Sequence, residues 1–193
     1  MSFLNLGRIL HITLFYLFIF SMLFKIAVTR KNNIYVFDID NTVCDTWRSL
    51  PRLKVENSNF IEDEKKRIGN LKIFKGMQEH IQKIYKSNNN LVIYLSLRPI
   101  FLWLSTKKYL KKYNILDSLS NLILVHKIDD KFTAINLLNK FTKAKIIFYD
   151  DLSYNHEYGN VLYYDKLINK LKKLDIIYFD YHQILKIQQR ENE

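Results

Sequence analysis

The chain has 193 residues, of which 48% are hydrophobic, and a formal net charge of +11. This length suits one domain of ordinary size with an additional segment, and four glycines with two prolines exclude a low-complexity or loop-dominated chain. The charge favours anionic partners such as phosphorylated substrates, nucleic acids or acidic membranes, although lysine-rich helix faces in water explain it equally well. Cys44 is the single cysteine, so a disulfide within the chain is excluded.

The first predicted element is a long apolar helix near the N-terminus. Residues 9–28 are almost wholly apolar and, as a helix, measure about 30 Å, close to the thickness of a bilayer core. We therefore predict a membrane anchor in residues 1–30 and a globular domain in residues 31–193. A cleavable signal peptide is the first alternative, but no A-x-A-like site follows the apolar run. A buried core helix is the second, but the run is apolar all round.

Charges at the two ends of this segment predict its orientation. Arg8 and the amino terminus lie on one side, whereas Lys25, Arg30 and Lys31 lie on the other. The positive-inside rule then predicts a single-pass membrane protein whose globular domain is cytoplasmic.

The rest of the chain alternates between apolar runs and helical patterns. Runs rich in β-forming residues predict strands at 34–37, 91–95, 122–125 and 146–149, with further strands at 161–164 and 176–179. Helices are predicted at about 76–85, 99–113, 131–140 and 167–174, an irregular flap at 43–75, and a polar tail after 179. This alternation is typical of an α/β fold with a Rossmann-like parallel sheet of about five to six strands.

Groups able to handle phosphate follow four of these strands. Asp38 and Asp40 follow the first strand, and Ser96 follows the second. Lys131 begins the helix after the third strand, and the pair at 150–151, both aspartates, follows the fourth. Because the carboxyl ends of parallel strands lie on one edge of a sheet, we expect these groups to converge there.

These motifs resemble those of the haloacid dehalogenase-like (HAD) hydrolase superfamily, over roughly residues 34–164. An apolar strand ending in D-x-D-x-T is similar to 34–42, with Asn41 in place of the commoner glycine. A strand ending in Ser or Thr is similar to 91–96, and a strand ending in D-D, preceded by a lone lysine, is similar to 146–151. The resemblance implies a HAD-like fold, and the short stretches between the motifs leave room for a minimal flap but no large cap.

The resemblance also implies roles for the residues that match these motifs. Asp38 would be the nucleophile that forms an aspartyl-phosphate, and Asp40 the general acid and then the general base. Mg²⁺ would be bound by Asp38, by Asp40 through its backbone carbonyl, and by Asp150, with Asp151 beside them. The substrate phosphate would be bound by Thr42, Ser96, Arg98 and Lys131.

Two of these assignments have rivals. Lys127 is also compatible with the lone-lysine motif, but the helix-start position favours Lys131. Arg98 follows Ser96 by two residues, as in polynucleotide 3′-phosphatases of the superfamily, and its alternative is an arginine that only pairs with a nearby group.

The sequence therefore predicts a Mg²⁺-dependent, capless HAD-like phosphatase that hydrolyses phosphomonoesters and is tethered to a membrane. An acid at position 40 points to phosphatase or phosphomutase chemistry, and mutases usually need a cap. Two alternatives stay open. One is a polynucleotide end-processing phosphatase, for which nucleic acid would be the partner. The other is a non-catalytic, membrane-attached binding module on the same fold. The class of phosphorylated substrate is also open.

Overall fold

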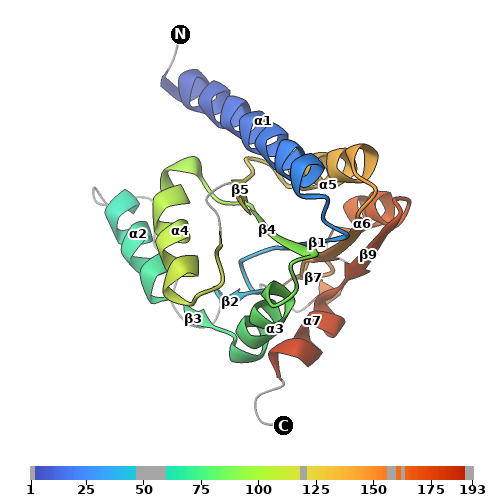
Figure 1. Cartoon of the computed structure of the whole chain (residues 1–193). Helices are drawn as coiled ribbons and strands as arrows, with labels where there is room; N and C mark the ends of the chain where they lie inside the picture. Colours follow the sequence, from blue (N-terminus) through green and yellow to red (C-terminus); the bar gives the residue numbers. More distant parts are fainter. Residues whose placement is uncertain (1–2, 47–59, 118–120, 156–159, 162–163, 190–193) are drawn as a thin grey trace.

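The computed structural model (Figure 1) describes residues 3–46, 60–117, 121–155, 160–161 and 164–189. Its centre is a sheet of five parallel strands. Their spatial order is β5 (Leu122–Leu124), β4 (Asn90–Ser96), β1 (Asn33–Phe37), β6 (Lys145–Tyr149) and β9 (Ile176–Phe179). The predicted α/β fold with a parallel Rossmann-like sheet is thereby confirmed.

The first strand, β1, lies in the middle of the sheet. From it the chain first builds outward through β4 to β5, then returns to the other side of β1 and builds β6 and β9. Such a reversal opens a crevice at the carboxyl ends of the central strands, where open α/β sheets bind ligands. The register aligns Phe37 of β1 with Tyr94 of β4 and with Tyr149 of β6. The residues that follow these three positions therefore emerge side by side.

Helices cover both faces of the sheet (Figure 1). Side chains along each strand alternate between the faces, so that Phe37 and Tyr94 pack on one side whereas Val36 and Ile93 pack on the other. The first face is covered by α2 (Phe60–Asn70), α3 (Lys75–Tyr85), α4 (Trp103–Lys112) and α7 (Tyr181–Gln188). The second is covered by α1 (Phe3–Thr29), α5 (Ile128–Phe141) and α6 (Asp165–Leu171). Burial on both faces explains why the strands are continuous apolar runs.

Two predicted elements after β6 are wrong. The strand predicted at 161–164 does not join the sheet: β8 (Asn160–Val161) pairs antiparallel with β7 (Tyr154–Asn155), and residues 162–163 lie outside the described residues. The place beside β6 is taken by β9, an apolar run of the same length as the one at 161–164. The predicted polar tail is helix α7, in which Ile184 and Ile187 lie on one buried face.

The region predicted to be irregular, 43–75, contains more structure than expected. Its helix α2 packs against α4, which follows a short 3₁₀ turn (Ile100–Leu102). Its two-residue strands β2 (Cys44–Asp45) and β3 (Lys72–Ile73) pair antiparallel. Residues 47–59, which include part of the predicted flap, lie outside the described residues. The described part forms a small flank to the sheet and not a domain of its own.

Helix α1 is long and apolar enough to cross a membrane over Leu10–Thr29, where its mean hydropathy is 2.0. A cleaved signal or a core helix can satisfy the same criterion. One side of α1 packs against the sheet through Phe15, Ile19, Met22 and Ile26. The sequence alone does not reveal which face is buried, because the opposite side of the helix is apolar too.

Candidate active site

The strand register brings the predicted acids together at the carboxyl edge of the sheet. The backbone N–H of Asp38 donates to the carbonyl oxygen of Tyr149 at 2.8 Å, which extends the β1–β6 pairing by one residue. Asp38 therefore lies beside Asp150, and both carboxyl groups are buried. Ser96 ends β4 on the other side of β1 and is buried as well. The convergence expected from parallel strand ends is what the structure shows.

Lys131 joins the two buried acids. Its Nζ donates to Asp38 Oδ1 at 2.9 Å and to Asp150 Oδ2 at 2.7 Å, and its side chain is buried. The rival candidate, Lys127, is exposed at the start of α5, where its backbone N–H is capped by Asp130 Oδ2 at 2.9 Å. Helix α5 begins at Ile128, three residues before the predicted start, and this places Lys131 at the end of its first turn.

Burial and mutual electrostatic interaction shift the pKa values of these three groups. Burial raises the pKa of Asp38 to about 7 and the pKa of Asp150 to about 6, although the neighbouring Lys131 ammonium opposes both shifts. Burial would lower the pKa of Lys131, but Asp150 and Asp38 reverse this and hold it above its ordinary value. Lys131 therefore keeps its positive charge between two carboxyl groups whose pKa values are raised.

The residues at this edge fit a divalent cation. One carboxylate oxygen from each of Asp38, Asp150 and Asp151 lies within 4.8 Å of the others. Asp150 Oδ1 is buried and accepts no side-chain hydrogen bond from the described residues, which leaves it able to bind a cation. Hard oxygen ligands of this kind suit Mg²⁺. The side chain of Asp40 does not belong to this group of three, and its predicted contribution through the backbone carbonyl stays a prediction.

The carboxylate of Asp40 is instead held by three other side chains. Arg98 donates to it twice, from Nε to Oδ2 at 2.9 Å and from Nη2 to Oδ1 at 2.6 Å. Ser96 Oγ donates to Oδ2 at 3.1 Å, and Thr46 Oγ1 donates to Oδ1 at 2.7 Å. Burial favours protonation, but Arg98 and these hydroxyls outweigh it and hold the pKa of Asp40 well below its usual range. Thr46 was missed in the sequence because no motif marks it.

Arg98, predicted to bind the substrate phosphate, is 5% exposed and packed inside the protein. Besides Asp40, it donates from Nη1 to Thr106 Oγ1 at 3.2 Å. Its guanidinium is thus committed to orienting the acid, which is closer to the alternative of an arginine paired with a nearby group. Its role toward substrate stays a prediction.

Arg98→Lys separates these two roles. A lysine cannot make the bidentate contact, so we expect Asp40 to be misplaced and kcat to fall by about 10- to 100-fold with KM nearly unchanged. An arginine that bound the substrate phosphate directly would raise KM instead. Steady-state kinetics with an aryl phosphate measures both constants. The matched control is Arg67→Lys, which removes an equally bidentate pair to Glu64 on α2.

Helix α7 holds the loop that follows Asp40 in place. Asn41 has a φ of 57°, a left-handed conformation that asparagine tolerates, which explains why it can stand in place of glycine. Gln188 Nε2 on α7 donates to the carbonyl oxygens of Asn41 at 2.8 Å and of Thr42 at 3.0 Å. Thr42 itself is buried, and its Oγ1 has no partner among the described residues. Gln188 was missed because α7 was predicted to be a polar tail.

Gln188→Ala should therefore affect both stability and rate. Two buried carbonyl oxygens lose their side-chain donor, and we expect the free energy of unfolding to fall by about 1–3 kcal/mol. We also expect kcat to fall several-fold because the loop carries Asp40. Denaturant unfolding and kinetics check the two effects, with the exposed neighbour change Gln189→Ala as control. An unchanged kcat in a destabilised Gln188→Ala protein would limit the residue to a structural role.

Metal and pH should act together on stability. The pKa values of Asp38 and Asp150 in the folded protein lie above the ordinary 3.8, so the metal-free fold binds more protons than the unfolded chain. Its free energy of unfolding should fall as the pH rises from about 4 to about 7. Mg²⁺ binds ionised carboxylates, so we expect it to raise Tm by about 5 °C or more at pH 8 and much less at pH 5. Thermal unfolding with Mg²⁺ or EDTA tests this, and Asp150→Asn should abolish the difference.

Comparisons with known proteins support the fold. No protein-family model matches the chain, and no curated protein matches it either. Among solved structures, the class C acid phosphatase from Bacillus anthracis is similar with a TM-score of 0.50 and 14% sequence identity. The similarity covers 94% of this chain and 84% of that one. At this identity it establishes a shared fold: an α/β architecture that, in the solved protein, belongs to an acid phosphatase.

Proposed function

We propose that this protein is a Mg²⁺-dependent phosphatase of the HAD-like type that hydrolyses phosphomonoesters through Asp38. One observation carries the proposal: the buried Lys131 ammonium contacts both Asp38 and Asp150, while Asp40 is held separately two residues away. A nucleophile, a cation-binding group and an acid are thereby present at one sheet edge. The fold shared with an acid phosphatase supports the same reading.

The chemistry assigned to these residues has two steps. In the first, an Asp38 carboxylate oxygen attacks phosphorus in line, the P–O ester bond breaks, and Asp40 gives its proton to the leaving oxygen. In the second, Asp40 takes a proton from a water molecule as its oxygen attacks phosphorus, the bond between phosphorus and the Asp38 oxygen breaks, and phosphate and the free Asp38 carboxylate are released. Lys131 and Ser96 stabilise the charge on the phosphoryl oxygens. Mg²⁺, held by Asp38, Asp150 and Asp151, would neutralise that charge further.

Asp40 must carry a proton for the first step, yet Arg98 keeps its carboxylate ionised in the structure described above. The proposal therefore includes a change in the Arg98–Asp40 contact when substrate binds. In this proposal Arg98 stays an orienting residue for Asp40, in keeping with its burial and with the nearly unchanged KM expected for Arg98→Lys.

A second part of the proposal concerns location. We propose that α1 attaches the protein to a membrane, because Leu10–Thr29 has the length and hydropathy that such a helix requires. The finer prediction, a single-pass helix with the catalytic domain on the cytoplasmic side, stays a prediction, as does the division at residue 30.

The test uses the full-length chain, because α1 contributes to the core. Purified protein in mild detergent should release phosphate from an aryl phosphate with Mg²⁺ and lose that activity with EDTA. A panel of sugar, nucleotide, lipid and polynucleotide 3′-phosphates then ranks the substrates, and selective activity on polynucleotides would favour the end-processing alternative. If a folded, Mg²⁺-stabilised protein hydrolyses none of these esters, the phosphatase proposal fails and a binding module is favoured.

A further inference from the structure

The inner face of α1 belongs to the protein core. Its side chains recur every three or four residues and are at most 5% exposed: His11, Phe15, Ile19, Met22 and Ile26. Polar contacts hold the helix at two points, since His11 Nε2 lies 3.1 Å from the carbonyl oxygen of Leu124 and Lys25 Nζ donates to Asn121 Oδ1 at 2.9 Å. In between, the Phe18 ring stacks on Trp103 with centroids 5.8 Å apart. The helix is thus docked from His11 to Ile26.

The opposite face of α1 has no folding reason to be apolar. Its large side chains are 52–72% exposed and follow one another at helical spacing, and we call them the outer stripe: Leu10, Leu17, Phe20, Phe24 and Val28. A surface helix of a globular protein normally carries polar residues on this side. A stripe of this length, about 27 Å from end to end, exceeds the scattered exposed leucines of an ordinary surface.

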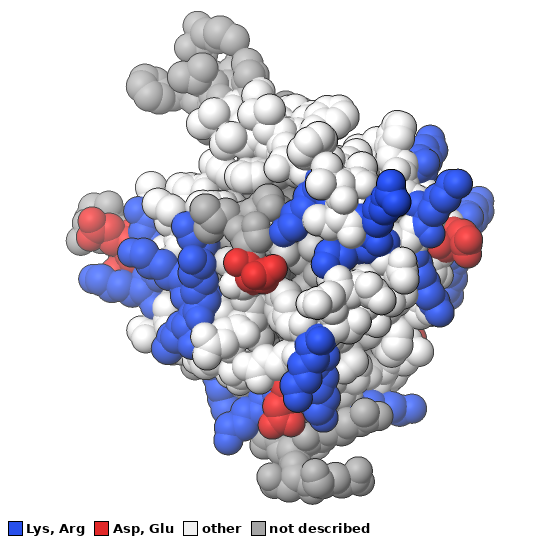
Figure 2. All heavy atoms as spheres, viewed as in Figure 1, with Lys and Arg blue, Asp and Glu red and all other residues white. Residues whose placement is uncertain are grey.

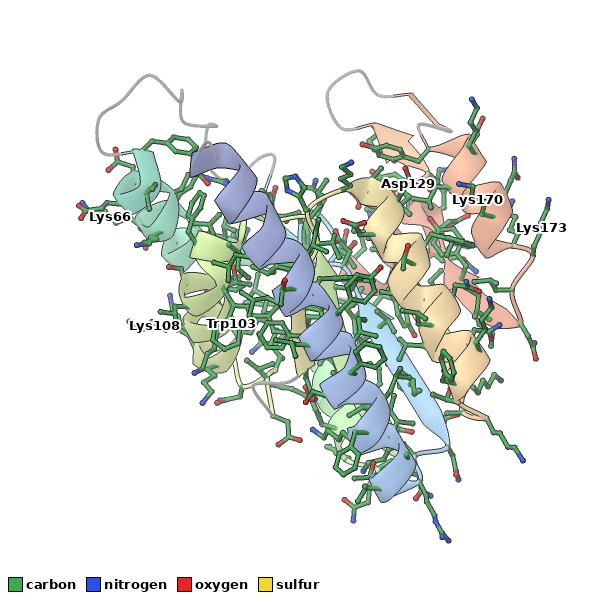
Figure 3. The ribbon with its side chains drawn as sticks, turned by 90° about the horizontal axis from the view of Figure 1, so that it is seen from above. Lys66, Trp103, Lys108, Asp129, Lys170 and Lys173 are labelled. Carbon is green, nitrogen blue, oxygen red and sulfur yellow. The ribbon has the colours of Figure 1, made fainter. Side chains whose placement is uncertain are left out.

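Positive charge lies on both sides of the outer stripe. Figure 2 shows the surface over the described part of α1 as uncharged, with lysines and arginines on either flank and some acidic residues beside them. Figure 3, seen from the α1 side, places Lys66 and Lys108 on one side of the helix and Lys170, Lys173 and Asp129 on the other, where Lys170 lies 3.7 Å from Asp129. The acidic and basic residues of α2, which carries Lys66, are equal in number. Every charged residue of α4, which carries Lys108, is a lysine. An apolar strip between cationic flanks is complementary to a bilayer with anionic headgroups.

We propose that α1 binds an anionic membrane while lying in the bilayer plane, with the outer stripe immersed and the inner face still packed on the sheet. The proposal rests on the membrane attachment proposed above and is independent of the phosphatase activity. It assigns each apolar face of α1 a separate partner, the sheet and the lipid. In the docked helix, His11 lies by the carboxyl end of β5 and Lys25 by its start, so α1 runs antiparallel to the strands. The sheet would then lie parallel to the bilayer.

Two other arrangements fit the contacts less well. A spanning helix would have to leave the sheet, exposing residues such as Ile34, Val36 and Ile93 to water and breaking the contacts of His11 and Lys25. A second copy of the chain packed stripe to stripe would bring two sets of cationic flanks together, which costs free energy. A bilayer surface keeps the core intact and neutralises the flanks.

Vesicle binding tests the outer stripe. Full-length protein is floated with preformed vesicles of phosphatidylcholine, with or without phosphatidylserine, and we expect at least about tenfold tighter binding to the anionic vesicles, weakening as salt rises. The triple change Leu17→Ser, Phe20→Ser and Phe24→Ser should lower the affinity at least about tenfold without lowering Tm. The control removes exposed apolar side chains elsewhere, Ile61→Ser and Ile177→Ser, and should bind normally. Unchanged binding by the triple variant would overturn the proposal.

Depth measurements separate the in-plane helix from the other arrangements. Single spin labels at Leu17→Cys, Phe24→Cys and Val28→Cys should all report a similar, shallow immersion of about 5–10 Å, while the native Cys44 is buried. A label at position 17 near the bilayer centre with a shallow label at position 28 would show a spanning helix, overturning the in-plane mode but not the attachment. Labels that never meet lipid, with concentration-dependent dimers, would overturn both. Phosphatase assays on the same samples succeed or fail independently.

Discussion

Asp38→Asn should reduce kcat on the order of 10⁴-fold or more, with little change in stability. The amide cannot attack phosphorus as a carboxylate can. The fold should persist because asparagine keeps the shape of the side chain, and its oxygen still accepts from Lys131 Nζ. The backbone contact of residue 38 to the Tyr149 carbonyl oxygen is untouched.

The measurements are kcat on an aryl phosphate with Mg²⁺ and thermal unfolding in the presence of EDTA. Asp175→Asn is the matched control, since Asp175 is an exposed aspartate before β9 and should alter neither quantity. A folded Asp38→Asn protein with more than about a tenth of normal activity would contradict the assignment of Asp38 as nucleophile.

Lys131→Met should abolish activity and also destabilise the protein, by about 3–5 kcal/mol at pH 8 in the absence of metal. Methionine keeps the length and apolar stem of the side chain but removes the ammonium that contacts Asp38 and Asp150. Two buried carboxylates are then left facing each other without a cation. Burial raises the pKa of both acids already in the unaltered protein, and without Lys131 both pKa values should rise further.

This prediction has a definite pH dependence. An acid whose pKa is higher in the folded than in the unfolded state stabilises the fold at low pH, and this contribution disappears as the pH rises through the folded value. The loss caused by Lys131→Met should therefore be small near pH 5 and large near pH 8, where Mg²⁺ should restore part of it. Denaturant unfolding at both pH values measures this. Lys127→Met, four residues earlier and exposed, is the control; a larger effect there would reverse the choice between the two lysines.

The local hydrophobic pattern was sufficient to predict the strands at the centre of the sheet. The runs at 34–37, 91–95 and 146–149 are strands because each is a continuous apolar stretch long enough to be buried on both faces. The same reasoning failed at 161–164, because composition does not show which of two apolar runs of equal length pairs with β6, and β9 takes that place. It also failed at α7, although Asp180 and Gln183 form a capping box that marks a helix start.

The candidate site was predictable in its members but not in their partners. The acids at 38, 40, 150 and 151 and the lysine at 131 stand at strand ends or a helix start, so their convergence followed from a parallel sheet. Arg98 was also singled out, but its bond to Asp40 joins residues 58 positions apart and depends on how two loops face each other. Thr46 and Gln188 lie in segments without a motif, and only packing brings them to the loop at 40–42.

The sequence by itself determined the residue types at the strand ends, the α/β class of the fold and the apolar character of the first helix. These follow from local composition and periodicity, which do not depend on distant parts of the chain. The tertiary structure decided which partner each group takes: Lys131 lies between Asp38 and Asp150, Arg98 holds Asp40, and one face of α1 covers the sheet. Such choices depend on strand register and on helix rotation, and both are set by the packing of the whole core.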